Sequence, residues 1–321
     1  MTEPIQLAVA DLGSNSFHLV LAEIDHNSLR IKQRLREHVQ LANGLTPTHE
    51  LTQEAQQRAL KCLEKFGQYT RELPYQQVSI VGTYALRIAH NLQDFLRQAQ
   101  KYLGHPVQVI SGELEAQLIY QGVLHSTMPT QAQRLVLDIG GGSTELIIGK
   151  GDVPRLLNSL DLGCVRLAEQ FFTPEVTTTS WSADAFQAAY FAACHLIASL
   201  RSQYRQLGWQ ECWGTSGTLD AVTQVLAAHH WSDQPGVSAR GLDQLRQYLL
   251  SHANLDISTL RGLHAERARV FPSGLAILCA VFDVLEIEHM RFAKGGLREG
   301  MLYQLAQYHL SNPALLVMPI A

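Results

Sequence analysis

The 321-residue sequence lacks the cysteine pattern of a disulfide-bonded or zinc-binding protein. Its five cysteines are odd in number, widely scattered and never arranged as CxxC, and its 14 histidines include no HExxH spacing. We therefore expect reduced cysteines that lie in the hydrophobic core, and no zinc site.

The sequence also shows no basic and apolar pattern of a leader before its first strand and no long apolar run. No basic and apolar stretch precedes the first expected strand, and the longest apolar run, Gly274 to Phe282, is far shorter than a membrane span. These absences predict a soluble cytoplasmic protein with no integral membrane segment. A net charge of −4 argues against nucleic acid as the main partner, because proteins that bind phosphate backbones are normally basic overall.

Three common catalytic motifs are missing as well: GxSxG, GxxxxGK[ST] and GxGxxG. The chain has instead the stretch LVLDIGGGSTELIIG at residues 135–149. Its pattern predicts a strand ending in Asp138, a turn of three glycines, and a second strand that starts near Glu145. Backbone N–H groups of such a turn, with the hydroxyls of Ser143 and Thr144 beside them, form a nest for phosphate oxygens. The flanking carboxylates suit a divalent cation that binds phosphates.

A lone glycine triplet is more often a plain hairpin, but this pattern occurs twice. Near the N-terminus the chain reads LAVADLGSNSFHLVLAEI, where Asp11 ends a strand and Phe17 begins the next. The repeat predicts two similar lobes that bind one polyphosphate.

The order of expected elements repeats in the same way. Three strands followed by alternating helices and strands occupy residues 7–123, including a helix capped by Thr52 and another that Asn91 starts. Periodicity fades over residues 124–134, and the order then begins again. We expect an α/β protein with two lobes of mixed sheets and a cleft between them, residues 1–127 and 128–321, with the final helix at 297–310 packing back on the first lobe.

Five motifs resemble the exopolyphosphatase and guanosine pentaphosphate phosphatase (Ppx/GppA) family of the actin-like ATPase superfamily, in its short two-domain form. In order they are DLGSNSFH at 11–18, GTYALR at 82–87, SGELEA at 111–116, DIGGGSTE at 138–145 and GTSGT at 214–218. The resemblance covers nearly the whole chain and implies two actin-like, ribonuclease H-like lobes.

The resemblance also implies roles for individual residues. Glu115 is the general base, Arg87 faces the phosphates, and Glu145 with Asp138 positions Mg²⁺, or Mn²⁺, and the attacking water. The full implied set comprises the catalytic residues Glu115, Glu145 and Arg87, the phosphate-binding residues Asp11, Gly13, Ser14, Asn15, Ser16, Gly140, Gly141, Gly142, Ser143, Thr144, Gly214, Thr215, Ser216 and Gly217, and the metal ligands Asp138, Glu145 and Asp11.

Without the resemblance, several of these residues have ordinary explanations. Glu115 lies in the first turn of an expected helix, where acidic residues are common because they interact favourably with the helix dipole. Arg87 alone could be a surface arginine, and residues 214–218 could be a simple tight turn. Arg267, Arg269, Lys294 and Arg298 are candidates for a basic strip, and the family usually has an acidic residue where Lys294 stands.

The leading hypothesis is an exopolyphosphatase that releases terminal phosphate from inorganic polyphosphate. The resemblance leaves guanosine pentaphosphate as a second substrate, and guanosine penta- or tetraphosphate as an inhibitor that would connect the protein to the stringent response. A guanosine pentaphosphate 5'-phosphohydrolase, a non-catalytic alarmone sensor and a small-molecule kinase are the alternatives. Because longer family members carry a further helical region, we expect hydrolysis to be less processive here unless a homodimer supplies the missing surface.

Overall fold

The computed structural model describes residues 4–26, 28–172, 182–252 and 255–310. The chain divides into two compact units. Unit 1 comprises residues 1–129 and 295–321, and unit 2 comprises residues 130–294. The chain thus returns to unit 1 after unit 2, and its last segment completes unit 1.

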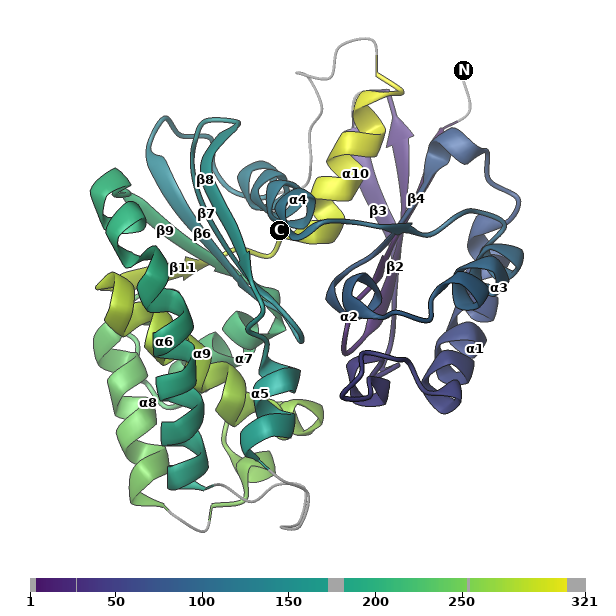
Figure 1. Cartoon of the computed structure of the whole chain (residues 1–321). Helices are drawn as coiled ribbons and strands as arrows, with labels where there is room; N and C mark the ends of the chain where they lie inside the picture. Colours follow the sequence, from purple (N-terminus) through teal and green to yellow (C-terminus); the bar gives the residue numbers. More distant parts are fainter. Residues whose placement is uncertain (1–3, 27, 173–181, 253–254, 311–321) are drawn as a thin grey trace. The chain divides into compact units, whose positions relative to one another are not determined.

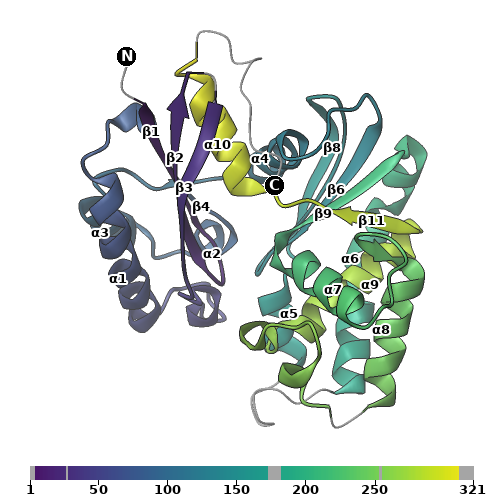
Figure 2. The ribbon, with the colours of Figure 1, turned by 180° about the vertical axis from the view of Figure 1, so that it is seen from behind.

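Unit 1 contains a five-stranded sheet with helices on both faces (Figure 1). Its strands are β1 (Ile5–Leu12), β2 (Phe17–Asp25), β3 (Ser28–Glu37), β4 (Val78–Gly82) and β5 (Gln108–Val109). Its helices are α1 (Gln53–Thr70), α2 (Tyr84–Ile88), α3 (Gln93–Leu103), α4 (Gly112–His125) and α10 (Leu297–Gln307). α1 and α3 lie together on one side of the sheet, and α10 lies on the other side (Figures 1 and 2).

Unit 2 contains a six-stranded sheet. Its strands are β6 (Gln133–Ile139), β7 (Thr144–Lys150), β8 (Val153–Leu160), β9 (Glu211–Thr215), β10 (Val237–Ser238) and β11 (His289–Phe292). Its helices are α5 (Cys164–Phe171), α6 (Ala183–Leu207), α7 (Ser216–Ala228), α8 (Ala239–Ser251) and α9 (Phe271–Leu285). Figure 2 shows α7, which follows β9, and α8, which follows β10.

Five strands of each sheet share one topology, and β10 adds an antiparallel edge strand in unit 2. The order is β3-β2-β1-β4-β5 in unit 1 and β8-β7-β6-β9-β11-β10 in unit 2. In each, the first three strands are antiparallel and the next two run parallel to the first. The repeat expected from the sequence is therefore present in the fold, and both glycine-containing turns join the first two strands of their sheets.

Side-chain caps explain several helix starts. Thr52 accepts a hydrogen bond from the Ala55 backbone N–H at 3.3 Å, as expected, and Ser111 accepts one from Leu114 N–H at 3.2 Å. The expectation for Asn91 was wrong, because α3 begins two residues later with Leu92 as its N-cap. The Asn91 amide instead pairs with the backbone N–H and C=O of Leu51, at 2.9 Å each.

Unit 1 is closed by a very tight contact between α4 and α10. A Cβ on Gly300 would lie 1.8 Å from the carbonyl oxygen of Leu118, and one on Gly122 would lie 1.9 Å from that of Gly296. Only glycine permits backbones to approach this closely. The backbone N–H of Gly295 also donates to Ser126 Oγ at 3.2 Å. The last helix is thereby fastened to α4, the helix that carries Glu115.

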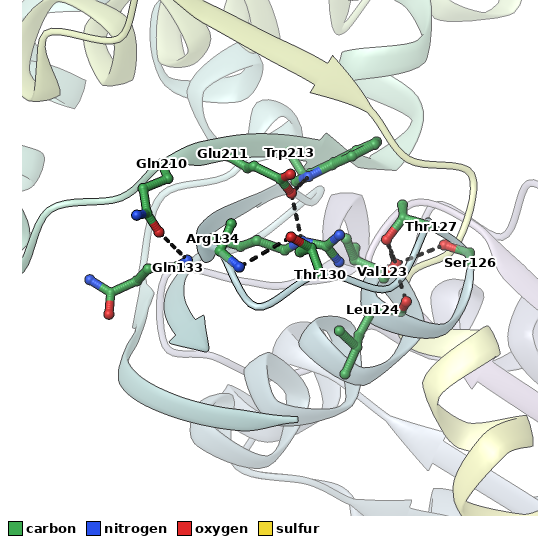
Figure 3. Close-up of polar contacts among 11 residues, drawn as sticks. Val123, Leu124, Ser126, Thr127, Thr130, Gln133, Arg134, Gln210, Glu211 and Trp213 are labelled. Carbon is green, nitrogen blue, oxygen red and sulfur yellow. Dashed lines mark hydrogen bonds and ion pairs between the residues drawn. The ribbon is translucent and has the colours of Figure 1, made fainter. Parts of the chain in front are cut away.

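A buried arginine, Arg134, lies near the start of β6, at the end of the unit 2 sheet away from the glycine turn (Figure 3). Arg134 on β6 is 2% exposed and its Nε donates to Glu211 Oε2 at 2.8 Å, while Trp213 Nε1 donates to the same oxygen at 3.1 Å. Burial opposes charge on Glu211, but these hydrogen bonds and the charges of Arg134 and Arg291 lower its pKa below the ordinary value. This network holds β6 to β9.

The structure also bears on two further expectations, namely reduced cysteines and no membrane-spanning helix. Cys62, Cys164, Cys212 and Cys279 are buried free thiols and Cys194 is a partly buried one, which confirms the expectation of reduced cysteines. Burial raises the pKa of Cys62 to about 12, so this thiol stays protonated. Among the described residues, no helix combines the length and apolar character that crossing a membrane requires.

Candidate active site

The first glycine-containing turn connects β1 and β2 of unit 1 at residues 13–16. The side chains of Ser14 and Ser16 are buried. Backbone N–H groups of Gln40 and Ala42 donate to the carbonyls of Asn15 and Ser14 at 2.8 and 2.9 Å. The turn therefore has a fixed shape, as a preformed phosphate nest requires.

A side chain that follows β3 also reaches this turn. His38 Nδ1 lies 3.2 Å from Ser16 Oγ, and either group donates according to the tautomer of the ring. Arg58 on α1 donates to the carbonyls of Val39 and Gln40 at 3.1 and 3.2 Å, and so holds the segment that carries His38.

Asp11 is the second-last residue of β1, two residues before Gly13 of the turn. Its Oδ1 is shielded from solvent and has no hydrogen-bond partner among the described residues. Desolvation raises the pKa of Asp11 to about 6, Arg298 on α10 lowers it in part, and Glu299 adds to the rise. An unpaired buried carboxylate oxygen is costly for the protein alone, which is typical of a group that binds a ligand.

Glu115 and Arg87 form an ion pair within unit 1. Arg87 Nη1 donates to Glu115 Oε2 at 3.0 Å and to the carbonyl of Ile110 at 3.1 Å. Glu115 is 7% exposed, whereas Glu113, two residues earlier on α4, is exposed. The structure thus separates the two acidic residues, and the buried one is the one that the arginine holds.

The second turn, residues 140–143, lies between β6 and β7 of unit 2. Gly140 N–H donates to the Ser143 carbonyl at 2.9 Å and closes the turn. The start of α5 supports it from behind, since Cys164 N–H donates to the Gly140 carbonyl at 3.0 Å. A Cβ on Gly163 would lie 2.3 Å from the Gly141 carbonyl oxygen, so this close support also requires glycine.

Four polar residues form one row across the unit 2 sheet beside this turn. Asp138 on β6 pairs directly with Thr215 on β9 and with Glu145 on β7, and Glu145 pairs directly with Ser159 on β8. Direct partners on neighbouring strands project from the same face of a sheet. We call Thr215, Asp138, Glu145 and Ser159 the polar row.

The segment after β9 begins α7 with a strained residue. Ser216 has φ of 87°, which is uncommon for a residue other than glycine and is often associated with functional sites. Its Oγ accepts from Thr218 N–H at 3.2 Å. A Cβ on Gly217 would lie 1.6 Å from Nη2 of Arg267, so this guanidinium rests directly on the first turn of α7. Arg267 thus adds positive charge beside the expected donors at residues 214–217.

Two of the three expected metal ligands are neighbours. Asp138 and Glu145 are direct cross-strand partners in unit 2, and Asp11 belongs to unit 1. Within the described ranges, no group of three or more His, Cys, Asp or Glu side chains is arranged to hold a metal ion. Two adjacent carboxylates nevertheless fit Mg²⁺ or Mn²⁺, because these ions commonly take one or two carboxylates and complete their shell with phosphate oxygens and water.

Sequence reasoning missed two side chains that contact expected site residues. Ser159 Oγ donates to Glu145 Oε1 at 2.7 Å, and His38 contacts Ser16. Counting back from the β7–β8 turn would not have revealed Ser159, because it pairs Glu145 with Asn158. A bulge between Ile148 and Gly149 shifts the register by one residue and brings Ser159 opposite Glu145. No local signal precedes His38 either.

Two sheets that share the topology of five strands, each with a glycine-containing turn between its first two strands in the chain, define a protein of the actin-like ATPase fold. The comparison of structures agrees with this class. A crystal structure of an exopolyphosphatase from Cytophaga hutchinsonii matches with a TM-score of 0.81 and 25% identity, over 94% of this chain and 98% of that one. The Ppx/GppA enzyme of Aquifex aeolicus matches with a TM-score of 0.74 and 24% identity, over 94% and 99% of the two chains.

The sequence comparison identifies the family. The model of the Ppx/GppA phosphatase family matches residues 20–309. A Haemophilus influenzae protein named "Putative exopolyphosphatase" is 44% identical over 301 residues, which is 94% of this chain and 91% of that protein. The chain belongs to the Ppx/GppA phosphatase family and is a phosphoanhydride hydrolase.

Proposed function

We propose that the protein is an exopolyphosphatase that transfers the terminal phosphoryl group of inorganic polyphosphate to water. The observation that supports this most is the duplicated turn. Each unit has a turn of glycine and serine residues that is held by backbone hydrogen bonds and follows a strand with an aspartate, and we infer that each turn binds phosphate oxygens. Inorganic polyphosphate presents phosphate oxygens at regular intervals for such turns. Unlike a nucleotide, it has no base or sugar that the protein must bind.

Glu115 is the general base in this proposal. A water molecule attacks the terminal phosphorus, its proton passes to Glu115, and the bond to the bridging oxygen breaks to leave a polyphosphate shorter by one unit. The Arg87 guanidinium donates to Glu115 Oε2 at 3.0 Å and so fixes the orientation of the carboxylate that accepts the proton. Arg87 therefore orients the base, in addition to any contact with phosphate.

Enzymes of this family generally depend on a divalent metal ion. Asp138 and Glu145 would hold Mg²⁺ or Mn²⁺ here, and the ion would neutralise charge on the phosphoryl oxygens. The backbone donors of residues 141–143 and 214–217 and the guanidinium of Arg267 would supply the remaining positive potential. Phosphoryl transfer depends largely on such positioning and neutralisation, so no covalent nucleophile is needed.

The test measures phosphate release by the purified protein from polyphosphates of several lengths and from guanosine pentaphosphate, side by side, with Mg²⁺, with Mn²⁺ and after chelation. We expect release from polyphosphate that requires a divalent ion. Faster turnover of guanosine pentaphosphate than of every polyphosphate would contradict the proposed substrate, and full activity after exhaustive chelation would contradict the metal role. Sedimentation of the same sample would show whether the active form is a homodimer.

A further inference from the structure

Ser159 lies in the last part of β8, outside every motif that points to phosphate chemistry. Its hydroxyl donates to Glu145 Oε1 at 2.7 Å, a short hydrogen bond to a carboxylate. Glu145 itself is only 1% exposed. A carboxylate so far from solvent depends on protein groups for its orientation, and the Ser159 hydroxyl is such a group.

The backbone places this hydroxyl accurately. β7 and β8 are paired without irregularity from Thr144 to Ile148, and Glu145 is the direct partner of Ser159 within this stretch. Thr144, the neighbour of Glu145, has its Oγ1 bonded to the carbonyl of Leu162 beyond β8. The hydroxyl therefore meets Glu145 because of strand register, and not by a chance rotamer.

The opposite face of β8 is held by a different contact. Tyr204 on α6 donates to Asn158 Oδ1 at 3.0 Å and to the carbonyl of Leu146 at 2.7 Å. Neighbouring residues on a strand project to opposite faces, so Asn158 is turned towards α6 and Ser159 towards Glu145. The two adjacent residues thus have separate tasks.

Glu145 also lies directly opposite Asp138. Like charges at directly paired positions destabilise a sheet. A hydrogen bond donated to one of the two carboxylates, or a cation bound by them, relieves this repulsion. The Ser159 hydroxyl occupies Oε1 of Glu145. A cation held by Glu145 and Asp138 would relieve the repulsion between them.

We propose that Ser159 is a positioning residue that orients the Glu145 carboxylate for a divalent cation shared with Asp138. This inference rests on the proposed function, because it needs a metal ion at the polar row. Hydrogen-bond partners that orient metal ligands typically contribute tenfold to hundredfold to metal affinity or activity. Ser159 should therefore matter for metal binding far more than for folding.

The experiment compares the full-length wild type with Ser159→Ala, Ser159→Thr and Asn158→Ala. Binding of Mn²⁺ alone is followed by the electron paramagnetic resonance signal of the free ion. The Mn²⁺ concentration for half-maximal phosphate release from polyphosphate is measured separately, and thermal unfolding in chelator reports on the fold.

We expect Ser159→Ala to bind Mn²⁺ about tenfold to a hundredfold more weakly, and to need correspondingly more Mn²⁺ for half-maximal activity. Saturating Mn²⁺ should recover much of kcat. Ser159→Thr keeps a hydroxyl at the same position and should stay close to the wild type. Asn158→Ala should unfold at lower temperature with unchanged Mn²⁺ dependence, because its contact with Tyr204 is on the other face.

Two outcomes overturn the inference, and they differ in what they say of the proposed function. If the wild type requires Mn²⁺ while Ser159→Ala matches it in both metal measurements, only the role of Ser159 is wrong. If the wild type neither binds Mn²⁺ nor needs a divalent ion for turnover, the metal role in the proposed function fails and the inference fails with it.

Discussion

Glu113 and Glu115 are two residues apart on α4, yet their surroundings differ completely. Glu113 is exposed, whereas Glu115 is buried against the Arg87 guanidinium. The i and i+2 positions of a helix face different directions, so only one of them can turn towards Arg87. This difference gives a matched pair for testing the general base.

Glu115→Gln should lower kcat by about 10²–10⁴, because the amide has nearly the same size but cannot accept the proton of water. Polyphosphate binding should change little, since the donors of both glycine-containing turns are intact. The measurement is steady-state phosphate release together with binding of a polyphosphate by calorimetry. Glu113→Gln is the control and should keep wild-type turnover; equal activity of the two variants would refute the assignment.

A second residue-scale prediction concerns stability and pH. The pKa of Asp11 is about 6 in the folded protein against an ordinary value of 3.8, so the folded state binds the proton more tightly than the unfolded chain. Protonated Asp11 favours folding at low pH, and this contribution is lost as the pH rises through about 6. Asp11→Asn cannot ionise and should be more stable than the wild type at pH 7.5, by at most about 3 kcal/mol, since one pKa unit corresponds to about 1.4 kcal/mol.

The gain from Asp11→Asn should shrink steadily as the pH falls towards 4. Urea unfolding of the metal-free protein at pH 5 and pH 7.5 measures it, with the exposed Asp233→Asn as the control. A gain that is independent of pH would mean that ionisation of Asp11 is not its cause. The variant should also lose activity, because the carboxylate adjoins the first phosphate turn.

The contact of α4 with α10 shows how one element fixes another. Gly300→Ala would drive a methyl group into the Leu118 carbonyl, with backbone on both sides and no flexible side chain to move. Overpacking of this kind typically costs about 1–3 kcal/mol, and we expect a loss at the upper end, of about 3 kcal/mol. Activity should fall too, because Glu115 is one helical turn from Leu118.

Chemical denaturation and phosphate release check the α4–α10 prediction. Gln304→Ala is the control, because Gln304 is an exposed residue of α10. Its free energy of unfolding should stay within about 0.5 kcal/mol of the wild-type value. If Gly300→Ala were as stable as Gln304→Ala, the close backbone contact would not be important for stability.

At the scale of the whole molecule, the chain leaves unit 1 and later returns to complete it. α10 buries Leu297, Met301, Leu302, Leu305 and Ala306 and packs on β1 and α4, whereas unit 2 is one continuous segment. A chain that ends at Lys294 therefore lacks part of the unit 1 core but none of unit 2. The two units should respond differently to this truncation.

We expect the truncated chain, residues 1–294, to keep a folded unit 2 and to lose protection in unit 1. Hydrogen exchange followed by mass spectrometry should show rapid exchange in β1, β2 and α4 and slow exchange in β6 and α9. The full chain should protect both sets. Slow exchange of β1 in the truncated chain would mean that α10 is dispensable for unit 1.

Local patterns in the sequence were sufficient for most elements and for both turns. The strands that flank Gly13 and the glycines at 140–142, the capped start of α1, and the repeated strand and helix order all depend on residues close in sequence, and the structure confirms them. Asn91 shows the limit of this reasoning. Asparagine is a common N-cap residue, but the side-chain amide of Asn91 forms two hydrogen bonds with the backbone of the distant Leu51 and caps no helix.

The sequence by itself determined the class of chemistry, because a nest needs glycine and serine at adjacent positions and the strand before each turn has an aspartate two residues before the first glycine. Only the tertiary structure decided which side chains meet those groups. Arg87 reaches Glu115 across 28 residues, Ser159 reaches Glu145 across 14, and α10 returns to unit 1 after the whole of unit 2. The physical reason is that such contacts depend on strand register, sheet order and the closeness of backbones, and these arise only when distant segments pack together.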